Sequence, residues 1–186
     1  MSNSLSVSNP SLLPPTNSAS SSEREPFMRF YLEPDTTALL PLPQLAEVFN
    51  IPISQIVPIA HMPAWIRGVY NWRGEILWIA DLGHLVGLTP SYQQRSNTLT
   101  YTTVVLQSHS NKATSTNVKN QLLGVIVNRL EDIEWCDLEQ IQSPPSSTVH
   151  QGLLPFLRGY WWKSDDDVLA VLDGEAIMAA MPKQDV

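Results

Sequence analysis

The chain has 186 residues, which suits one domain or two small ones, and 43% of its residues are hydrophobic, enough for a real core. Eleven Lys and Arg residues against eighteen Asp and Glu residues leave a formal net charge of −7. A duplex nucleic-acid binder normally carries a basic face, and anionic membrane surfaces attract basic segments. The charge therefore argues against both kinds of partner.

The cysteine count and the hydropathy pattern indicate where the protein works. Cys136 is the single cysteine and cannot form an internal disulfide, which favours a reducing compartment. No apolar run approaches the roughly 18 residues that a membrane-spanning helix needs. The first residues also lack the basic start and apolar middle of a signal peptide. We therefore expect a soluble cytoplasmic protein that does not insert into a membrane.

The first residues differ in composition from the rest of the chain. Residues 1–26 are rich in Ser, Pro and Asn, and such a segment cannot bury enough apolar surface to offset the entropy of ordering it. The sequence therefore predicts a disordered tail over 1–26, a folded domain over 27–181 and a short C-terminal end over 182–186. Leu12 and Leu13 could form a docking motif, although a plain tail is the favoured interpretation.

Short β-type runs alternate with turn signals from residue 27 onward. The expected strands are Phe27–Leu32, Thr37–Leu42, Leu45–Phe49, Gly68–Trp72, Glu75–Ala80, Tyr101–Gln107, Gln121–Val127 and Val168–Leu172. Arg73-Gly74 is expected to form a tight turn, 108–120 an exposed hairpin loop, and Gly174–Met181 a short helix. This spacing favours a mainly β barrel or sandwich. The loops are too short for helices that cross over between parallel strands.

Two stretches of the chain share one pattern. PAWIRG at 63–68 is answered by PFLRG at 155–159. Each is followed by aromatic residues, a polar turn and a strand that ends in aspartate, Asp81 in the first copy and Asp173 in the second. The pattern suggests two similar small barrels packed as one unit.

No catalytic or metal-binding constellation is visible in the sequence. The histidines lack metal-ligand spacing and Cys136 has no local partner, so no zinc site is indicated. Asp165, Asp166 and Asp167 fit a solvated hairpin tip better than a calcium loop. No nucleophile elbow, P-loop or dinucleotide motif occurs. We expect no enzymatic activity, no metal and no cofactor.

Two charged residues stand among apolar neighbours. Glu47 lies in LAEVF, where Leu45, Glu47 and Phe49 would share one face of a strand. Arg73 lies in GVYNWRGEILWIADLG, residues 68–83. Each charge could be exposed, at a strand edge or a hairpin tip. Alternatively the two could pair, because an unpaired buried charge is very costly and the planar fork of Arg suits a carboxylate.

The stretch around Arg73 resembles the signature of a known family. GVYNWRGEILWIADL is similar to the CheW motif, which has Gly-Val, Asn, Arg-Gly and then a strand ending in Asp-Leu. Further segments match in order: LAEVF, IVPIAHMPAWIRG, LLGVIVNRLEDI, EQIQSPP and LRGYWWKSDDDVLAVLDGEAIM. Asn-x-Arg-Gly alone is a weak signal, but the ordered set extends over nearly all of 27–181 and is specific.

The resemblance implies a mainly β, CheW-like fold of two interleaved five-stranded SH3-like β-barrel subdomains with a short C-terminal helix. It implies a non-catalytic adaptor that couples the cytoplasmic tip of methyl-accepting chemoreceptors to the regulatory domain of a CheA-type histidine kinase, in arrays at the inner membrane. It places a structural salt bridge at Glu47 and Arg73. It assigns receptor or kinase binding to Leu45, Glu47, Gly68, Arg73 and Leu130.

The chain departs from the family pattern at a few positions. Asn128 stands where the family often has Asp, and Trp72 and Trp78 replace commoner aliphatic residues. The Ser-rich start is also longer than usual. The tryptophan-rich form of the motif resembles adaptors of cyanobacterial-type phototaxis or type IV pilus motility systems.

An alternative function is an SH3-like barrel that binds a proline-rich peptide or RNA. The net charge of −7 counts against RNA. Trp65, Tyr70, Trp72 and Trp78 could line a groove for a proline-rich ligand, although such residues more often fill a core. An enzyme ranks third.

Overall fold

The structure is a computed structural model that describes residues 24–94, 98–108, 121–143, 150–164 and 167–182. Most of the predicted tail, nearly all of the predicted 108–120 loop and most of the C-terminal end lie outside these residues. None of the helices in the described ranges is long and apolar enough to cross a membrane.

The described chain folds mainly as β-strands, which confirms the predicted fold class. The strands are β1 (Arg24–Leu32), β2 (Thr36–Pro41), β3 (Leu45–Pro52), β4 (Ile66–Trp72), β5 (Glu75–Asp81), β6 (Thr100–Gln107), β7 (Leu122–Val127), β8 (Arg129–Asp137), β9 (Leu157–Ser164) and β10 (Asp167–Leu172). The α-helices are α1 (Leu82–Leu85) and α2 (Gly174–Ala179). Short 3-10 turns η1 (Leu42–Gln44), η2 (Ile53–Gln55), η3 (Ser91–Gln93), η4 (Leu138–Gln140) and η5 (Leu154–Phe156) join them.

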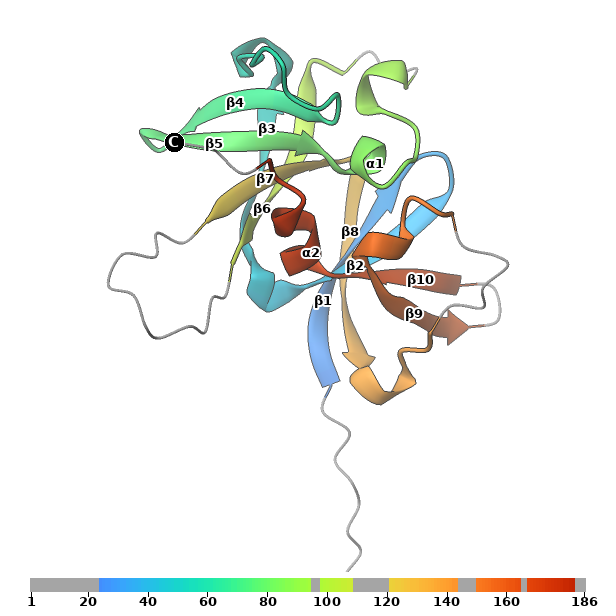
Figure 1. The fold of residues 1–186 in the computed structure, drawn as a ribbon. Helices are drawn as coiled ribbons and strands as arrows, with labels where there is room; N and C mark the ends of the chain where they lie inside the picture. The colour runs from blue at the N-terminus through green and yellow to red at the C-terminus, as the bar shows by residue number, and fades with distance from the viewer. Residues whose placement is uncertain (1–23, 95–97, 109–120, 144–149, 165–166, 183–186) are drawn as a thin grey trace, which may run out of the picture.

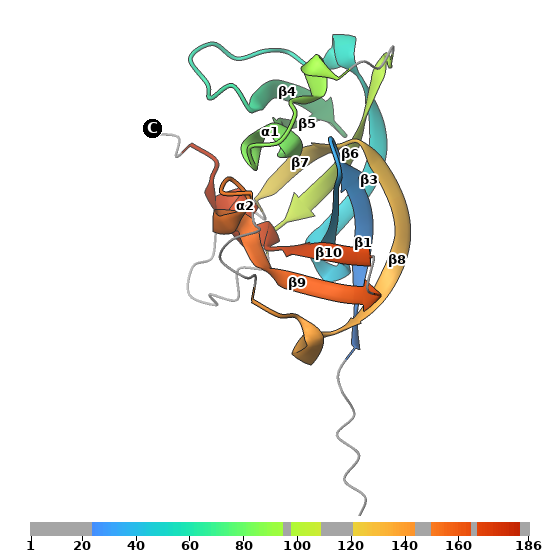
Figure 2. The same cartoon turned by 90° about the vertical axis from the view of Figure 1, so that its right-hand side faces the viewer.

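The strands form two five-stranded sheets that interleave along the chain. The first sheet, in the order β8-β1-β2-β10-β9, takes strands from both ends of the described chain. The second, in the order β3-β6-β7-β5-β4, comes from one continuous segment between them. Figure 1 shows β4 and β5 of the second sheet above β9 and β10 of the first, with α2 between them. In Figure 2, β8 sweeps around one side of the molecule.

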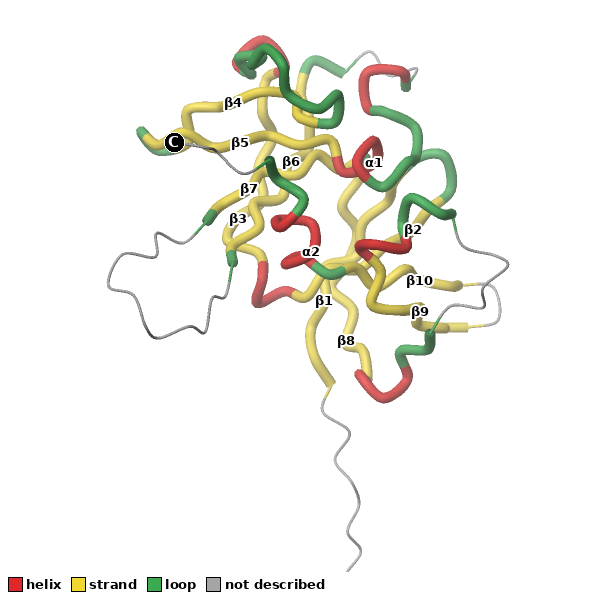
Figure 3. The backbone as a smooth tube through the Cα atoms, viewed as in Figure 1, coloured by secondary structure: helices red, strands yellow, loops and turns green. Residues whose placement is uncertain are grey.

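The sheets are not the fully closed barrels that the family resemblance implied. The ladder of each sheet is open, and a single bridge draws its edges together: Val57 with Val69 in the second sheet and Gln142 with Tyr160 in the first. The loops that follow η2 and η4 supply Val57 and Gln142. Figure 3 shows the loops and turns in green between the yellow strands.

Both sheets contain a parallel pair, which the loop lengths had argued against. β5 pairs with β7, and β2 pairs with β10. No crossover helix is needed, because a complete strand or more lies between the partners along the chain. The connection from β5 to β7 passes through α1, η3 and β6.

Three hydrophobic clusters divide the core. The residues Phe27, Leu39, Cys136, Leu169 and Val171 all belong to the first sheet and fill its interior. The residues Ile51, Leu77, Ile79, Val105 and Ile126 do the same for the second sheet. The largest cluster takes residues from both sheets and from α2, so it joins the two halves into one unit.

The start of the folded region differs from the prediction. Arg24, Glu25 and Pro26 already pair with Asp137, Cys136 and Trp135 of β8, so the predicted tail is three residues too long. Arg24, Glu25 and Pro26 resemble the tail in composition. Their partner strand lies about 110 residues further along the chain, so a local pattern could not predict the pairing. β8 itself was missed because its acidic residues obscure the alternation.

The repeated sequence pattern corresponds to a repeated structural unit. A side chain at Gly68 or Gly159 would overlap the backbone oxygen of Val57 or Gln142, the bridge residue in the same sheet. Asp81 is the last residue of β5 and Asp173 directly follows β10, and the two cap the helices α1 and α2. Each motif thus closes one sheet and begins one helix.

Candidate functional site

The β4–β5 hairpin ends in the tight turn that the sequence predicted. Trp72 pairs with Glu75, and the two residues between them have positive φ, 54° at Arg73 and 85° at Gly74. This geometry is that of a two-residue type I′ turn, in which a glycine is favoured. The Gly74 amide also donates to the Asn71 side chain over 3.0 Å. The turn therefore holds Arg73 at a defined tip.

Arg73 and Glu47 are brought together across the second sheet. Arg73 Nη2 lies 2.8 Å from Glu47 Oε2, and the Trp72 indole donates to the same oxygen over 3.0 Å. The Arg73 guanidinium also lies 4.8 Å from the Trp72 ring centroid. The Arg73 side chain is 68% exposed and that of Glu47 is 31% exposed. Solvent screening therefore limits the pair to about 1 kcal/mol or less.

A β-bulge at Ala46 separates Leu45 from Glu47. Leu45 pairs with Leu106, but Glu47 pairs with Val105, so the register shifts by one residue between them. Leu106 belongs to the core shared by the sheets, whereas Val105 belongs to the interior of the second sheet. The expectation that Leu45 and Glu47 share a strand face is therefore wrong, because the bulge turns them to opposite sides.

Leu45 and Leu130 occupy equivalent places in the two sheets. Leu45 is the first residue of the edge strand β3 and Leu130 the second residue of the edge strand β8. Each precedes a register shift, and each packs against the shared core. Gly68, on β4, is buried against the Val57 backbone. Four of the five predicted binding residues thus form two groups: Glu47 and Arg73 pair in the second sheet, and Leu45 and Leu130 contact the core between the sheets.

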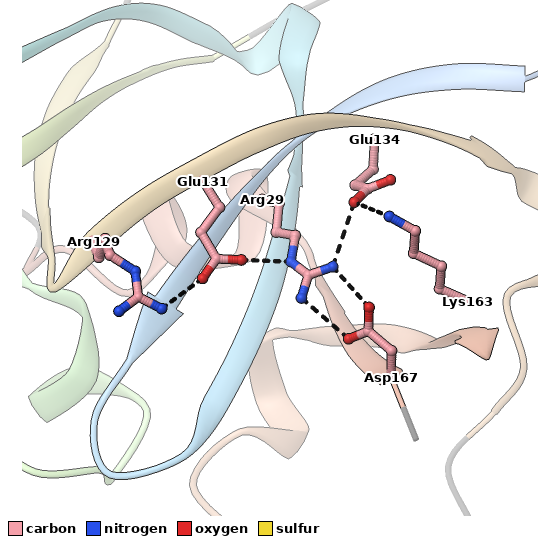
Figure 4. Close-up of polar contacts among 6 residues, drawn as sticks. All are labelled: Arg29, Arg129, Glu131, Glu134, Lys163 and Asp167. Carbon is pink, nitrogen blue, oxygen red and sulfur yellow. Dashed lines mark hydrogen bonds and ion pairs between the residues drawn. The ribbon is translucent and has the colours of Figure 1, made fainter. Parts of the chain in front are cut away.

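A second charged cluster, centred on Arg29, was missed by the sequence analysis (Figure 4). Arg29 in β1 donates to Glu131 over 2.6 Å and to Asp167 over 2.8 Å, and it reaches Glu134 at 3.4 Å. Lys163 and Arg129 add ion pairs of 2.6 and 2.7 Å to Glu134 and Glu131. The available signal was the position of Arg29 two residues after the core residue Phe27, on the same strand face.

The Arg29 cluster shifts the pKa of Arg29 and of Glu131. Burial alone would lower the pKa of Arg29, but hydrogen bonds to Asp167 and Glu131 outweigh it and raise that pKa. The hydrogen bond from Arg129 lowers the pKa of Glu131; burial opposes this, and Arg29 adds to it. Arg29 and Glu131 are consequently held in their charged forms, and the cluster ties β1, β8, β9 and β10 together.

Asn128, which departs from the family pattern, joins the two sheets at the β7–β8 connection. Its side-chain oxygen accepts from the Glu33 amide in the β1–β2 turn over 3.0 Å, and its amide group contacts Gln94 in the loop after α1. Its backbone amide also donates to Tyr31 over 3.1 Å. A side chain with both a donor and an acceptor suits this position.

A cavity of about 880 Å³ lies between the two halves of the molecule. It is lined by the β1–β2 turn, the loop after α1, and parts of β9 and β10, including Tyr160 and Trp162. The aromatic residues considered for a peptide groove lie elsewhere. Trp65 and Trp78 pack on the core between the sheets, and Tyr70 and Trp72 pack inside the second sheet. This packing against two different clusters favours a core role for the four residues over a shared peptide groove.

No group of three or more potential metal ligands occurs among the residues that the structure describes. Cys136 is fully buried, and burial raises the pKa of its thiol to about 12. Such a thiol is not a reactive nucleophile near neutral pH.

Comparisons with known proteins agree with this architecture. A family model described as CheW-like domain matches residues 26–181. The chemotaxis protein CheW of Treponema pallidum (strain Nichols) is 26% identical over 95 residues, which cover 51% of this chain and 50% of that protein. The chain thus spans about half the length of this curated relative.

A solved structure shows the same fold. The scaffolding protein TtCheW from Thermoanaerobacter tengcongensis matches with a TM-score of 0.62 at 21% identity, covering 81% of this chain and 90% of that one. The family match spans nearly the whole folded region, from Pro26 in β1 to Met181, two residues beyond the end of α2. The chain therefore belongs to the CheW-like domain family.

Proposed function

We propose that this protein is a non-catalytic adaptor that couples chemoreceptors to a CheA-type histidine kinase. The observation that carries the proposal is membership of the CheW-like family over residues 26–181. The printed names of its relatives, a chemotaxis protein and a scaffolding protein, fit the same role. In this proposal the protein acts in the cytoplasm and is recruited to receptor arrays at the inner membrane.

The doubled architecture, in which each sheet keeps open edge strands within the described residues, supports separate partner contacts. Arg73 stands at the β4–β5 hairpin tip, where it is largely exposed, and its partner Glu47 lies in the edge strand β3. Leu45 and Leu130 lie at the starts of the two edge strands, whose outer backbone groups have no ladder partner within the described residues. Edge strands and projecting turns both suit protein–protein contacts. We assign the receptor to the groove near Leu45, Glu47, Gly68 and Leu130, and the kinase to a different surface.

The tryptophan-rich motif suggests which pathway the adaptor serves. The Trp72 indole donates to Glu47, and Trp78 packs on the shared core. Both tryptophans are thus part of the framework that presents the site. On this resemblance we place the adaptor in phototaxis or type IV pilus motility signalling.

The test is a pair of binding measurements with matched variants. The full chain is titrated with a receptor cytoplasmic fragment and with a kinase regulatory domain, both encoded in the same genome. Leu130→Asp should weaken receptor binding and leave kinase binding intact. Ile133→Asp is the control, because Ile133 lies on the same strand but is already 48% exposed.

Circular dichroism must show that both variants remain folded, since Leu130 also contacts the core. If Leu130→Asp does not fold, Leu130→Met, which keeps the apolar contact, replaces it and should shift receptor binding only. Equal loss of receptor and kinase binding in a folded variant would exclude separate surfaces. Failure of the native chain to bind either partner would exclude the adaptor function.

A further inference from the structure

Arg67 is the extra residue of a β-bulge in the second sheet. Ile66 pairs with Ala80 and Gly68 pairs with Ile79, so two steps along β4 match one step along β5. A bulged residue has no ladder partner, and its side chain is turned away from the regular alternation of the strand. The bulge therefore re-aims the Arg67 side chain.

The Arg67 side chain is turned toward Tyr92 in the loop after α1. Its guanidinium carbon lies 4.9 Å from the Tyr92 ring centroid. The His84 ring also packs on Tyr92, edge to face, with 6.0 Å between the ring centroids, so Arg67, His84 and Tyr92 form one cluster. Asp81 holds the loop by accepting from the backbone amides of His84 and Ser91 over 3.1 and 2.7 Å. The Asp81 carboxylate is thus directed to backbone groups.

This cluster contains every buried side-chain nitrogen or oxygen that lacks a hydrogen-bond partner within the described ranges. The three atoms are Arg67 Nε, His84 Nδ1 and Ser91 Oγ. Buried polar atoms in native proteins nearly always have partners, so an unpaired atom calls for an explanation. Arg67 and His84 lie beside the Tyr92 ring and Ser91 precedes Tyr92 in the chain, so one acceptor from outside the chain would satisfy the unpaired atoms.

Charge and chemistry define that group. Arg67 has no carboxylate within ion-pair distance in the described structure, whereas Arg29, Arg73 and Arg129 each have at least one. The three atoms can all act as donors, and a carboxylate accepts two parallel bonds from an arginine fork. A doubly charged phosphate would meet stronger repulsion from the nearby Asp81. A singly charged carboxylate is the better fit.

Exposed apolar residues lie in the loop after η2, which bridges β4 through Val57 and Val69. The Val57–Pro58 backbone contacts Gly68, the next residue after Arg67, and Val57 and Ile59 are 59% and 41% exposed. Tyr92 is itself 50% exposed. A partner segment that carries an acidic residue among aliphatic residues matches both the cation and the apolar surface.

We propose that Arg67, with His84 and Ser91, binds an acidic side chain of the chemoreceptor, which sits among aliphatic residues of the receptor. This deepens the receptor contact near Gly68 and rests on the proposed adaptor function. Arg67 then contributes specificity to the contact, because a receptor without the carboxylate would leave the three donors unpaired.

The chain offers a matched control for the test. Arg158 is the equivalent bulge residue of the first sheet, between Leu157 and Gly159, and it is exposed. Arg67→Gln should weaken binding to the receptor fragment at least about tenfold and reduce its salt dependence, and Arg158→Gln should leave both unchanged. Arg67→Lys keeps the charge without the fork and should give an intermediate loss.

If the native chain and Arg67→Gln bind the receptor fragment equally well, the inference is wrong while the adaptor function stands. If Arg67→Gln fails to fold by circular dichroism, Arg67→Lys gives the answer in the same assay.

If the native chain does not bind the receptor fragment, the adaptor function fails and a receptor-free readout decides the inference. The probe is the peptide acetyl-Leu-Glu-Leu-amide, followed through the Arg67 Nε–H signal by NMR. A saturable shift with this peptide, absent with its Gln analogue, supports the carboxylate site. An unmoved signal overturns it.

Discussion

At the scale of single residues, Glu47 shows that a short distance does not by itself make a strong ion pair. Its carboxylate meets both Arg73 and the Trp72 indole, but the Arg73 side chain is 68% exposed. Water competes for an exposed guanidinium and salt screens it. The part-buried indole bond goes to the same Glu47 oxygen, and we expect it to orient Glu47 at least as firmly as Arg73 does.

A double-mutant cycle tests this division of roles. With Glu47→Ala and Arg73→Ala, we expect a coupling free energy of about 1 kcal/mol or less from denaturant unfolding. Trp72→Phe keeps the ring but removes the donor, and Glu47 should couple to it at least as strongly. A Glu47–Arg73 coupling near 3 kcal/mol would instead indicate a pair shielded from solvent.

Gly68 is the residue whose replacement should cost most at this scale. Its φ is 138°, and a Cβ there would overlap the Val57 carbonyl group, which makes the bridge to Val69. Gly68→Ala should lower the free energy of unfolding by about 3 kcal/mol or more, measured by urea denaturation.

Gly74 provides the comparison, because it also has positive φ but nothing lies within 4 Å of its Cβ position. Gly74→Asn should cost less than about 1 kcal/mol, since Asn tolerates this conformation. Similar losses at both glycines would mean that the backbone conformation matters and the close approach to Val57 does not.

At the scale of elements, the sequence could predict strands whose alternation is clean and failed where charges enter a strand. β5, β6 and β7 were expected within one residue or two of their bounds, as was the β4–β5 turn. β8 carries Glu131, Asp132, Glu134 and Asp137, which read as a polar loop. Glu131 and Glu134 fit a strand because Arg29 and Lys163, from other strands, pair with them.

The candidate site was predictable to a similar degree. The partnership of Glu47 and Arg73 could be proposed from charge and family pattern. The bulges at Ala46 and Arg67 could not, because an extra residue in one strand is defined only against its neighbour in the ladder. The direction of Leu45 and of Arg67 therefore had to come from the structure.

The Arg29 cluster makes the first sheet sensitive to acid. The pKa of Glu131 in the folded protein lies below its ordinary value of 4.5, so its stabilising effect is complete above that value and is lost as the pH falls through the folded pKa. The free energy of unfolding should therefore decline below pH 4.5. Glu131→Gln should lower stability at neutral pH and make this decline shallower.

Guanidinium chloride would screen the ion pairs, so urea titrations at several pH values are the appropriate measurement. Glu139→Gln is the control, because Glu139 is exposed and its carboxylate has no ion pair in the described chain. An unchanged acid slope in Glu131→Gln would show that other carboxylates dominate acid unfolding.

At the scale of the whole molecule, the fold begins at Arg24, three residues earlier than composition predicted. Arg24–Pro26 belong to the first sheet through β8, whereas the match to the family begins at residue 26. A chain that starts at Arg24 should therefore melt within a few degrees of the full chain in a thermal scan.

Starting at Phe27 instead should lower the melting temperature, because three ladder positions next to Asp137, Cys136 and Trp135 are removed. Equal melting temperatures for the two truncations would show that these pairs contribute no stability. A clear drop already in the chain that starts at Arg24 would mean that residues before it contribute to the fold.

The interleaved order of the strands also has a consequence during protein synthesis. The ribosome releases β1 and β2 first, but β8, β9 and β10, which complete their sheet, emerge only after the whole second sheet has been made. Folding units generally form as they become complete. We therefore expect the second sheet, β3–β7, to fold before the first sheet, and β1 and β2 to pack fully only once β8, β9 and β10 have been made. Limited proteolysis of stalled nascent chains ending beyond Val127 should find β3–β7 protected and β1–β2 still cleavable.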